Sequence, residues 1–338
     1  MDGFSKKTLV TKRSLKYTYY VSPEGEASEK HPALLFLHGF PDSAHLWTDV
    51  IAALGPVPNK IIVPDCLGYA GTDKPEDMAM YVYDGQAADL QDILEAETIP
   101  TGPKTVVIGH DWGSVLAQRL YLHHRSLFKG VVLVNTGYIV PSSDKFDLEA
   151  ANSFTEKLLG YPQLAYWELF TASDAADIIN PRLEQMWLAL HADRPHWMKE
   201  MFCVKGAMRD FLLEGDKSLP LKSYATGPKH RQHFLDQFSQ ANGGFEGALQ
   251  MYKTTANNMQ GNAFAKLPPM DLTINVPVLY IICTDDAVCR PELMMDPAKA
   301  KGLVPKVRDV VLDCGHWSPM EKPNDIAAEL RVFLEKDV

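Results

Sequence analysis

The sequence has few of the features that mark secreted, membrane-spanning or metal-binding proteins. It contains five cysteines among 338 residues, an odd number with no Cys-x-x-Cys pair, so we expect reduced, buried thiols and neither a disulfide framework nor a zinc site. No apolar run approaches the ~18 residues needed to cross a bilayer. No apolar segment follows the basic residues near the N-terminus, as one would in a secretory signal. We therefore expect a soluble, cytoplasmic protein.

Positive charge is also scarce. The chain has 33 Lys and Arg against 43 Asp and Glu, a formal net charge of -10, and it has no basic stripe that could follow a phosphate backbone. Nucleic acid is therefore not an expected partner, and the negative charge disfavours anionic substrates at long range. With 46% hydrophobic and 22% charged residues, the composition is that of an ordinary globular protein. None of these quantities determines an oligomeric state.

Short apolar runs alternate with stretches of helical spacing in the first part of the chain. Helices are predicted over 85–97 and 114–123, between strands at Ala33 to Leu37, Ile61 to Val63, Val106 to Ile108 and Val131 to Val134. The same alternation returns near the end, with strands predicted over 276–283 and 308–314 and a helix over 324–335. This pattern predicts an α/β fold with a mostly parallel central sheet flanked by helices.

A long interval without β-type runs separates these two parts. From about residue 141 to 268 the sequence is rich in Met, Trp, Phe, Leu and helix formers, and Pro181, Pro195 and Pro220 are natural breaks between helices. We interpret residues 141–268 as a helical cap domain inserted into one α/β core, which consists of residues 1–140 and 269–338. The length of the chain fits one large domain with an insertion as well as two domains.

The segment "VIGHDWGS", residues 107–114, has the pattern of a nucleophile elbow, a sharp strand-to-helix turn whose glycines relieve backbone crowding. The central residue is Asp111, where the familiar hydrolases have serine. A carboxylate is already ionised at neutral pH, and its attack on carbon would give an ester bound to the enzyme. An isolated Asp at such a junction is more often the N-cap of the following helix, which would begin near Trp112. The elbow alone therefore leaves both interpretations open.

Two further stretches favour the catalytic interpretation. His-Gly-Phe-Pro, residues 38–41, follows the first core strand, where this kind of fold places its second oxyanion donor. The backbone amides of Phe40 and Trp112 would then face the developing negative charge. His316, in "LDCGHWSPMEKP", lies in the loop after the last strand, where the histidine of a nucleophile–acid–histidine triad belongs.

The acid that would orient this histidine has two candidate positions. "CTDDAVC" follows the penultimate strand and offers Asp285 or Asp286, either of which could hold the imidazole in its working tautomer. The alternative position follows the strand at residues 131–134, where the sequence has Asn135 and Thr136. The acid is therefore expected to be Asp285 or Asp286.

Taken together, "HGFPD", "DCLGYAGTDKP", "GHDWGS", "CTDDAVC" and "CGHWSPMEKP" resemble motifs of the soluble epoxide hydrolases of the α/β-hydrolase fold. The resemblance extends from about residue 34 to 332, and it implies an inserted cap that carries two tyrosines over the nucleophile. The first family tyrosine begins a Tyr-x-x-x-Phe stretch, which fits Tyr166 in "YWELF", with Tyr161 as the alternative in a shifted register. The second fits Tyr252. The family's Asp-x-Val stretch selects Asp286 over Asp285.

The resemblance implies a reaction in two steps. Asp111 would open the epoxide ring while Tyr166 and Tyr252 donate to its oxygen, and water activated by His316 and Asp286 would then hydrolyse the ester to a vicinal diol. No cofactor and no metal are implied. The apolar residues of the cap favour a small, neutral, lipophilic epoxide as substrate.

Other functions of the same fold are less consistent with the sequence. Haloalkane dehalogenases have a side-chain donor to the halide where this chain has Phe40, and fluoroacetate dehalogenases have an arginine where it has Trp112. "RPHW", residues 194–197, is similar to the His-Trp pair of the fluoroacetate enzymes, but we expect His196 and Trp197 to be packing residues. A serine esterase would need Ser114, which lies past the second glycine. A non-catalytic receptor of this fold would gain little from a reactive aspartate.

Overall fold

The computed structural model describes residues 1–338 and contains one sheet of eight strands. The strands lie in the order β1-β2-β4-β3-β5-β6-β7-β8. Strands β3 to β8 are mutually parallel, whereas β1 and β2 form an antiparallel edge. Their bounds are β1 (Ser5–Val10), β2 (Lys16–Val21), β3 (Ala33–Leu37), β4 (Ile61–Pro64), β5 (Thr105–His110), β6 (Phe128–Val134), β7 (Val278–Cys283) and β8 (Val307–Leu312).

The predicted α/β fold with a mostly parallel sheet is confirmed, and every predicted strand has a counterpart. The edge formed by β1 and β2 was not predicted, because β1 (SKKTLV) is almost entirely exposed and carries no apolar run. The central strands β3, β4 and β5 are buried along their whole length. This explains why they read as continuous apolar runs, since helices cover both faces of the sheet.

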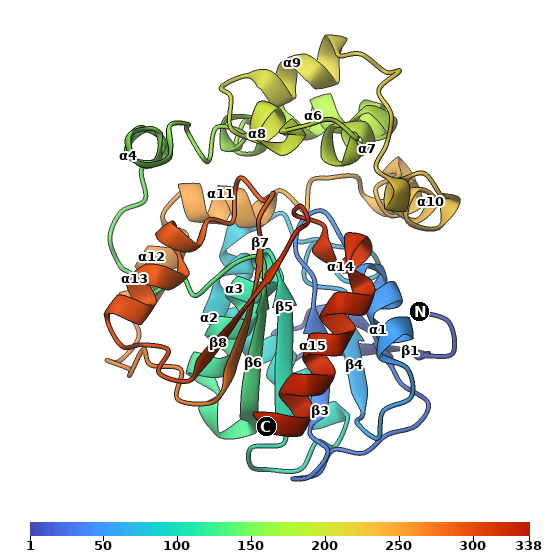
Figure 1. Ribbon diagram of the computed structural model, residues 1–338, viewed down its shortest axis with the longest axis vertical. Helices are drawn as coiled ribbons and strands as arrows, with labels where there is room; N and C mark the ends of the chain where they lie inside the picture. Colours follow the sequence, from blue (N-terminus) through green and yellow to red (C-terminus); the bar gives the residue numbers. More distant parts are fainter.

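The helices of the core lie on both faces of the sheet (Figure 1). On one face α1 packs against α15, and on the other α2 packs against α3, which also contacts β5 and β6. The longest helices have 14 residues, and none carries an apolar stretch that could traverse a bilayer. The bounds of the core helices are α1 (Thr48–Leu54), α2 (Tyr83–Ala96), α3 (Trp112–His123), α13 (Met295–Ala300), α14 (Ser318–Glu321) and α15 (Pro323–Lys336).

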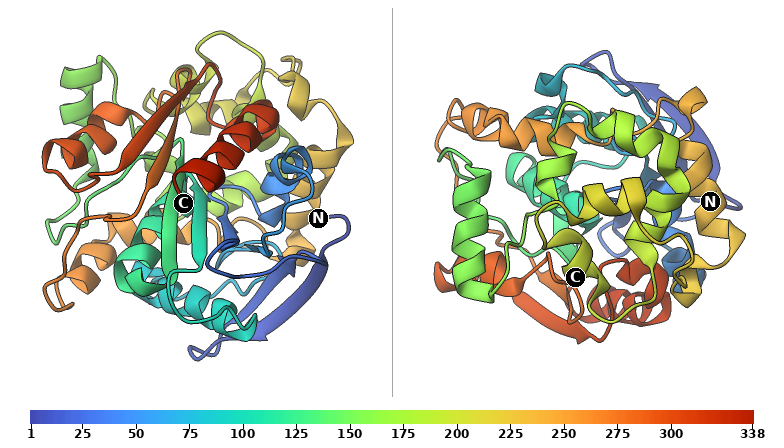
Figure 2. Two further views of the ribbon diagram at one scale, coloured as in Figure 1. Left: turned by 60° about the horizontal axis from the view of Figure 1, so that its bottom comes forward. Right: turned by 90° about the horizontal axis from the view of Figure 1, so that it is seen from above.

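All the chain between β6 and β7 lacks strands and contains nine α-helices. Helices α4 and α6 to α10 lie beyond one end of the sheet in Figure 1, and they cover it when the molecule is seen from above (Figure 2). Pro181, Pro195 and Pro220 each fall between two of these helices, as expected. The bounds are α4 (Leu148–Leu159), α5 (Trp167–Phe170), α6 (Ala175–Ile179), α7 (Leu183–His191), α8 (Trp197–Phe202), α9 (Ala207–Glu214), α10 (Pro228–Gln237), α11 (Gln250–Ala256) and α12 (Met259–Phe264).

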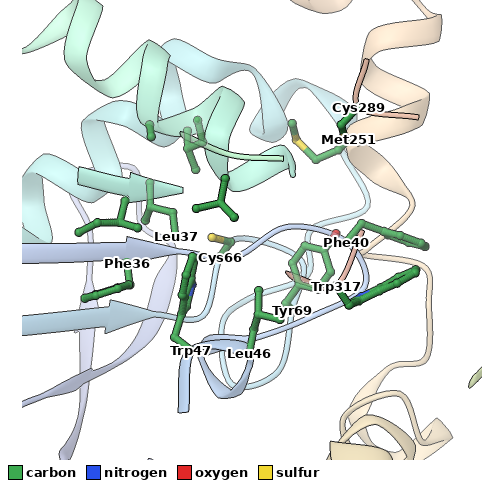
Figure 3. Packing of buried hydrophobic residues seen from close by; sticks show 14 of the residues in the cluster. Phe36, Leu37, Phe40, Leu46, Trp47, Cys66, Tyr69, Met251, Cys289 and Trp317 are labelled. Carbon is green, nitrogen blue, oxygen red and sulfur yellow. The ribbon is translucent and has the colours of Figure 1, made fainter. Parts of the chain in front are cut away.

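Aromatic side chains link the sheet to the loops at this end of the molecule. Phe36, on β3, packs against Trp47 with their ring centroids 5.1 Å apart (Figure 3). Phe40 lies four residues further along, in the loop that follows β3, and its ring is buried among aromatic side chains of the helices above. Aromatic contacts therefore fix the loop after β3 to the sheet at one end and to the helices above it at Phe40.

The turn between β5 and α3 is the tightest point of the core. Asp111 has a φ of 54°, a backbone conformation that residues other than glycine rarely adopt. A Cβ atom on Gly109 would lie 2.2 Å from the carbonyl oxygen of Gly113, and one on Gly113 would lie 2.3 Å from that of Leu37. Both elbow glycines are thus required by close backbone approach, as the sequence pattern predicts. The turn projects Asp111 beyond the carboxyl ends of the strands.

We predict that Gly113→Ala destabilises the protein by about 3 kcal/mol or more. The added Cβ would clash with the backbone of Leu37 and His38, which cannot move without distorting the sheet. Thermal and urea unfolding followed by circular dichroism would measure the change. Gly227→Ala is the matched control, since a Cβ there would meet nothing within 4 Å. Equal losses of stability in the two variants would contradict the packing argument.

Candidate active site

The carboxylate of Asp111 points toward the loop after β3 and not into its own helix. Its Oδ1 accepts a hydrogen bond from the backbone amide of Phe40 at 2.8 Å, and its side chain makes no capping hydrogen bond to α3. Burial raises the pKa of Asp111, while His316 and the amides of Phe40 and Trp112 act to lower it. Asp111 thus occupies the N-cap position of α3 without the usual side-chain cap, and its carboxylate faces the two predicted oxyanion donors, the amides of Phe40 and Trp112.

His316 lies between two carboxylates. Its Nδ1 is 2.7 Å from Oδ2 of Asp286, and its Nε2 is 3.7 Å from Oδ2 of Asp111. Burial lowers the pKa of His316, but the charges of Asp286 and Asp111 outweigh it and raise the pKa to about 9. In turn, His316 and hydrogen-bond donors hold the pKa of Asp286 well below its usual range, despite burial. With a pKa of about 9, His316 is an imidazolium at neutral pH, and it lies between the carboxyl groups of Asp286 and Asp111.

The two neighbouring aspartates of "CTDDAVC" occupy different environments. Asp286 is 1% exposed, and its Oδ1 accepts hydrogen bonds from the backbone amides of Val288 (2.9 Å) and Cys289 (2.8 Å). Asp285 is exposed. The geometry therefore favours Asp286, in agreement with the Asp-x-Val register.

Asn135 is a site residue to which the sequence reasoning assigned no role. It follows β6 with a φ of 63°, and its Nδ2 donates to Oδ2 of Asp286 at 2.7 Å, the oxygen that also faces His316. Its Oδ1 accepts from the hydroxyl of Ser318 at 2.6 Å. Asn135 thus orients the acid from the position where the alternative acid was considered. The signal in the sequence was its place at the end of a core strand.

Asp42 is a second carboxyl that was missed, although it directly follows His-Gly-Phe-Pro. It is 7% exposed, and burial raises its pKa to about 7, opposed by His316. Its charge is one of those that raise the pKa of His316. It lines a different cavity from Asp111, so the structure assigns it an electrostatic influence on the histidine.

The two predicted tyrosines lie together above Asp111. Tyr166 precedes α5 and Tyr252 is on α11, with their rings 5.9 Å apart and nearly perpendicular. Burial raises both pKa values well above 10, and the charge of Asp111 adds to the effect. Tyr161, in the rival register, instead donates to the carbonyl of Ala287 at 3.0 Å and lines none of the cavities that contain Asp111. The geometry therefore favours Tyr166.

Two cavities meet at Asp111. A cavity of about 500 Å³ extends from Asp111 and Tyr166 between α3 and the segment that follows β6, with a majority of hydrophobic side chains in its lining. A space of about 10 Å³, close to the size of one water molecule, is lined by Asp111, His316, Tyr166 and Tyr252 together with Phe40, Met198, Phe202, Val288 and Trp317. Four of the five predicted catalytic side chains, Asp111 among them, therefore line this one space.

One group of side chains has the elements of a metal site. Single ligand atoms of Asp286, Cys289 and His316 lie within 4.8 Å of one another. However, the imidazole Nδ1 is already hydrogen bonded to Asp286, and burial raises the pKa of the Cys289 thiol well above 9. The group is better described as a hydrogen-bonded triad with a neutral thiol beside it.

The residues of the alternative functions lie elsewhere. The hydroxyl of Ser114 is fully buried and donates to the carbonyl of Gly109 at 2.6 Å, so it cannot act as a nucleophile. His196 is exposed, and Trp197 is buried among the helices, where its indole donates to the carbonyl of Ala189 at 2.8 Å. Trp197 is therefore a packing residue, as predicted, whereas His196 is a surface residue and the prediction of a packing role for it is wrong.

Comparison with known proteins gives a consistent result. Residues 32–323 match the family described as the alpha/beta hydrolase fold. The chain is 32% identical over 314 residues to an epoxide hydrolase of Caballeronia sordidicola, covering 90% of this chain and 87% of that protein. It is 26% identical over 308 residues to the bifunctional epoxide hydrolase 2 of Rattus norvegicus, covering 91% of this chain but only 52% of the longer rat protein.

Among solved structures, epoxide hydrolase A from Mycobacterium thermoresistibile has a similar fold. It superimposes with a TM-score of 0.75 over 98% of each chain, at 23% sequence identity. This similarity concerns the fold.

We predict that Asp286→Asn lowers the pKa of His316 from about 9 toward its ordinary value of 6.5. Removing the anion destabilises the imidazolium, which burial already disfavours. Stability that the raised pKa contributes is fully present below pH 6.5 and is lost as pH rises through about 9, so the variant loses most stability at and below neutral pH. NMR titration of ¹⁵N-labelled histidines, with His316→Gln to assign the signal, would measure the pKa. Asp285→Asn is the control, and an equal shift in that variant would contradict the assignment.

Proposed function

Because the chain belongs to the α/β-hydrolase fold family and, within it, to the epoxide hydrolases, we propose that it converts epoxides to vicinal diols through an ester on Asp111. The observation that carries this proposal is the single small space lined by Asp111, His316, Tyr166 and Tyr252. A carboxylate nucleophile, a base and two acids are the groups that the reaction requires, and they surround one point.

Ring opening uses the carboxylate and the two phenols. Oδ1 of Asp111 is held by the amide of Phe40, so Oδ2 is the oxygen that attacks an epoxide carbon, forming the ester C–O bond as the ring C–O bond breaks. The leaving alkoxide oxygen takes a proton from one of the two phenols, Tyr166 or Tyr252. Since the pKa values of Tyr166 and Tyr252 lie well above 10, both phenols are protonated donors at neutral pH.

Esterification changes the charge beside His316. The free enzyme holds the imidazolium between Asp286 and Asp111, and forming the ester neutralises Asp111. One of the charges that raise the pKa of His316 is thereby removed, so the histidine loses its proton more readily at this stage. That proton restores the phenolate that ring opening leaves behind. We infer that the ester itself converts His316 from an ion-pair partner into a general base.

Hydrolysis completes the cycle. Neutral His316 takes a proton from a water molecule, and the hydroxide attacks the carbonyl carbon of the ester. The oxyanion that forms is stabilised by the amides of Phe40 and Trp112, which already contact the carboxylate. Collapse of this intermediate breaks the acyl C–O bond, and the leaving oxygen takes the proton of the new carboxylic acid. This step releases the diol and restores the carboxylate of Asp111. Asp286 stays ionised and holds the imidazole in place.

The side chain at position 40 supports an epoxide over a halide as substrate. The ring of Phe40 packs against Phe170 and Tyr252, with centroids 4.8 and 5.0 Å away. It presents no donor to a leaving halide, whereas the two phenols line the space beside Asp111, where they can donate to an epoxide oxygen. The largely apolar cavity suits a lipophilic substrate.

We predict that His316→Gln accumulates a covalent adduct with a neutral epoxide such as styrene oxide. Ring opening does not need the base, while ester hydrolysis does. Rapid acid quenching followed by peptide mass spectrometry should show the elbow peptide heavier by the mass of the substrate, with the modification on Asp111. Asp111→Asn is the control and should remain unmodified. Unmodified peptide in both variants, from enzyme whose wild-type form turns over, would contradict the covalent mechanism, and faster release of halide from haloalkanes would favour a dehalogenase.

We also predict that Tyr166→Phe and Tyr252→Phe each slow ring opening by about 10-fold or more, because each removes one acid that protonates the leaving oxygen. Pre-steady-state formation of the ester would separate this effect from hydrolysis. Tyr161→Phe is the matched control, since its hydroxyl bonds to the backbone outside the cavity. If Tyr161→Phe slows the step and Tyr166→Phe does not, the register of the first tyrosine is wrong.

A further inference from the structure

One cationic side chain in the large cavity has no role in the mechanism. Arg119 lies on α3, the helix that begins directly after Asp111, and it is 7% exposed. Trp112, Val115 and Arg119 all line the cavity. Their spacing of three and four residues places them on one face of the helix. The cavity that starts at the nucleophile therefore has a buried guanidinium in its wall.

Arg119 is not paired with an acid. It forms no salt bridge, and its pKa is lowered by burial and raised only by Tyr83 and Tyr138, with no carboxylate among the groups that act on it. Its Nη1 donates to the carbonyl of Ile139 at 2.9 Å, and its guanidinium lies over the ring of Tyr83 at 5.3 Å. Its Nε and Nη2 donate to no protein group. A buried cation is normally paired, so the unused donors of Arg119 are unusual.

The polar groups around Arg119 are occupied by one another. The Oε1 of Gln260 accepts from the amide of Tyr83 at 3.0 Å, and the Oδ1 of Asn258 accepts from the amide of Phe146 at 2.6 Å. At the exposed rim, Oδ2 of Asp144 accepts from Ser142 at 2.7 Å, and Lys145 lies next to it. Apart from the ammonium of Lys145 at the exposed rim, the charged donors left for a ligand belong to the guanidinium of Arg119.

We propose that Arg119 binds an anionic group, a carboxylate, at the end of the substrate distant from the epoxide. The inference rests on the proposed function and specifies its substrate class as an epoxide on an apolar chain that ends in a carboxylate. Arg119 lies eight residues along α3 from Asp111, about 12 Å at 1.5 Å per residue, so the chain must span several carbon atoms. A planar guanidinium binds a carboxylate through paired hydrogen bonds, which gives direction as well as affinity.

This assignment is compatible with the acidic net charge of the protein. The net charge of -10 acts on approach over long distances, where salt screens it. Arg119 acts in contact, in a buried wall where charge-assisted hydrogen bonds are strong. The apolar majority of the cavity lining would bind the chain between the two ends.

The test compares a straight-chain terminal epoxide that ends in a carboxylate with its methyl ester. In the wild type we expect kcat/KM for the acid to exceed that for the ester by about 10-fold or more, mainly through KM. Arg119→Met should abolish this preference and Arg119→Lys should keep part of it. Lys145→Met, at the exposed rim of the same cavity, is the control for general attraction and should keep the preference. An unchanged ratio in Arg119→Met, or an equal loss in Lys145→Met, would overturn the proposal.

A binding experiment separates this proposal from the proposed function. Calorimetric titration of the wild type with octanoate and with octanamide needs no turnover, and octanoate should bind about 10-fold more tightly. This difference should shrink in Arg119→Met and persist in part in Arg119→Lys, whose melting temperature shows whether the charge-keeping variant is folded. Equal affinities for the two compounds in the wild type would overturn the role of Arg119 even if the enzyme hydrolyses epoxides. Failure of the wild type to turn over either epoxide, with octanoate still preferred, would instead contradict the epoxide hydrolase function alone.

Discussion

Burying the carboxylate of Asp111 is the constraint on which the rest of the site depends. Removing a negative charge from water is costly unless cations and hydrogen-bond donors replace the water. The loop after β3 supplies the amide of Phe40, α3 supplies that of Trp112, and the loop after β8 brings His316 to 3.7 Å. Since these groups stabilise the anion before the reaction, they are already in position for the charges that develop during it.

The same constraint accounts for the second layer of residues. His316 is stabilised as an imidazolium chiefly by Asp286, 2.7 Å away, and further by Asp111. Asp286 in turn is held by Asn135 and by two backbone amides. In the reaction that we propose, losing one charge to an ester disturbs this balance and makes the histidine a base. In this proposal the same paired charges that stabilise the free site also make the histidine basic only after the ester has formed.

Much of the site could be predicted because it depends on local patterns. Asp111 lies in a turn whose glycines are dictated by backbone contact, and His316 follows the last core strand, so topology alone brings them together. The residues alone left Asp285 and Asp286 open, and the resemblance selected Asp286 through its Asp-x-Val stretch, a choice with which the burial of Asp286 agrees. The resemblance likewise preferred Tyr166 to Tyr161, and the packing of the helices against the core favours the same residue. Asn135 and Asp42 act through tertiary contacts that no local pattern specifies.

The sequence by itself determined the fold class and the positions of Asp111 and His316, the proposed nucleophile and base, because strand periodicity, turn chemistry and chain order are properties of short segments. Only the tertiary structure decided which of the remaining polar side chains face the cavity. Arg119 is the clearest case: along the chain it is one cation in a helix, where a solvated or paired side chain is the usual expectation. Its burial beside unused space, without an acid, arises where α2 packs against both α3 and α12, two helices more than 100 residues apart in the sequence. Long-range packing sets the local dielectric and the partners of each charged group. It therefore determined the surroundings of Arg119, to which we assign substrate selection.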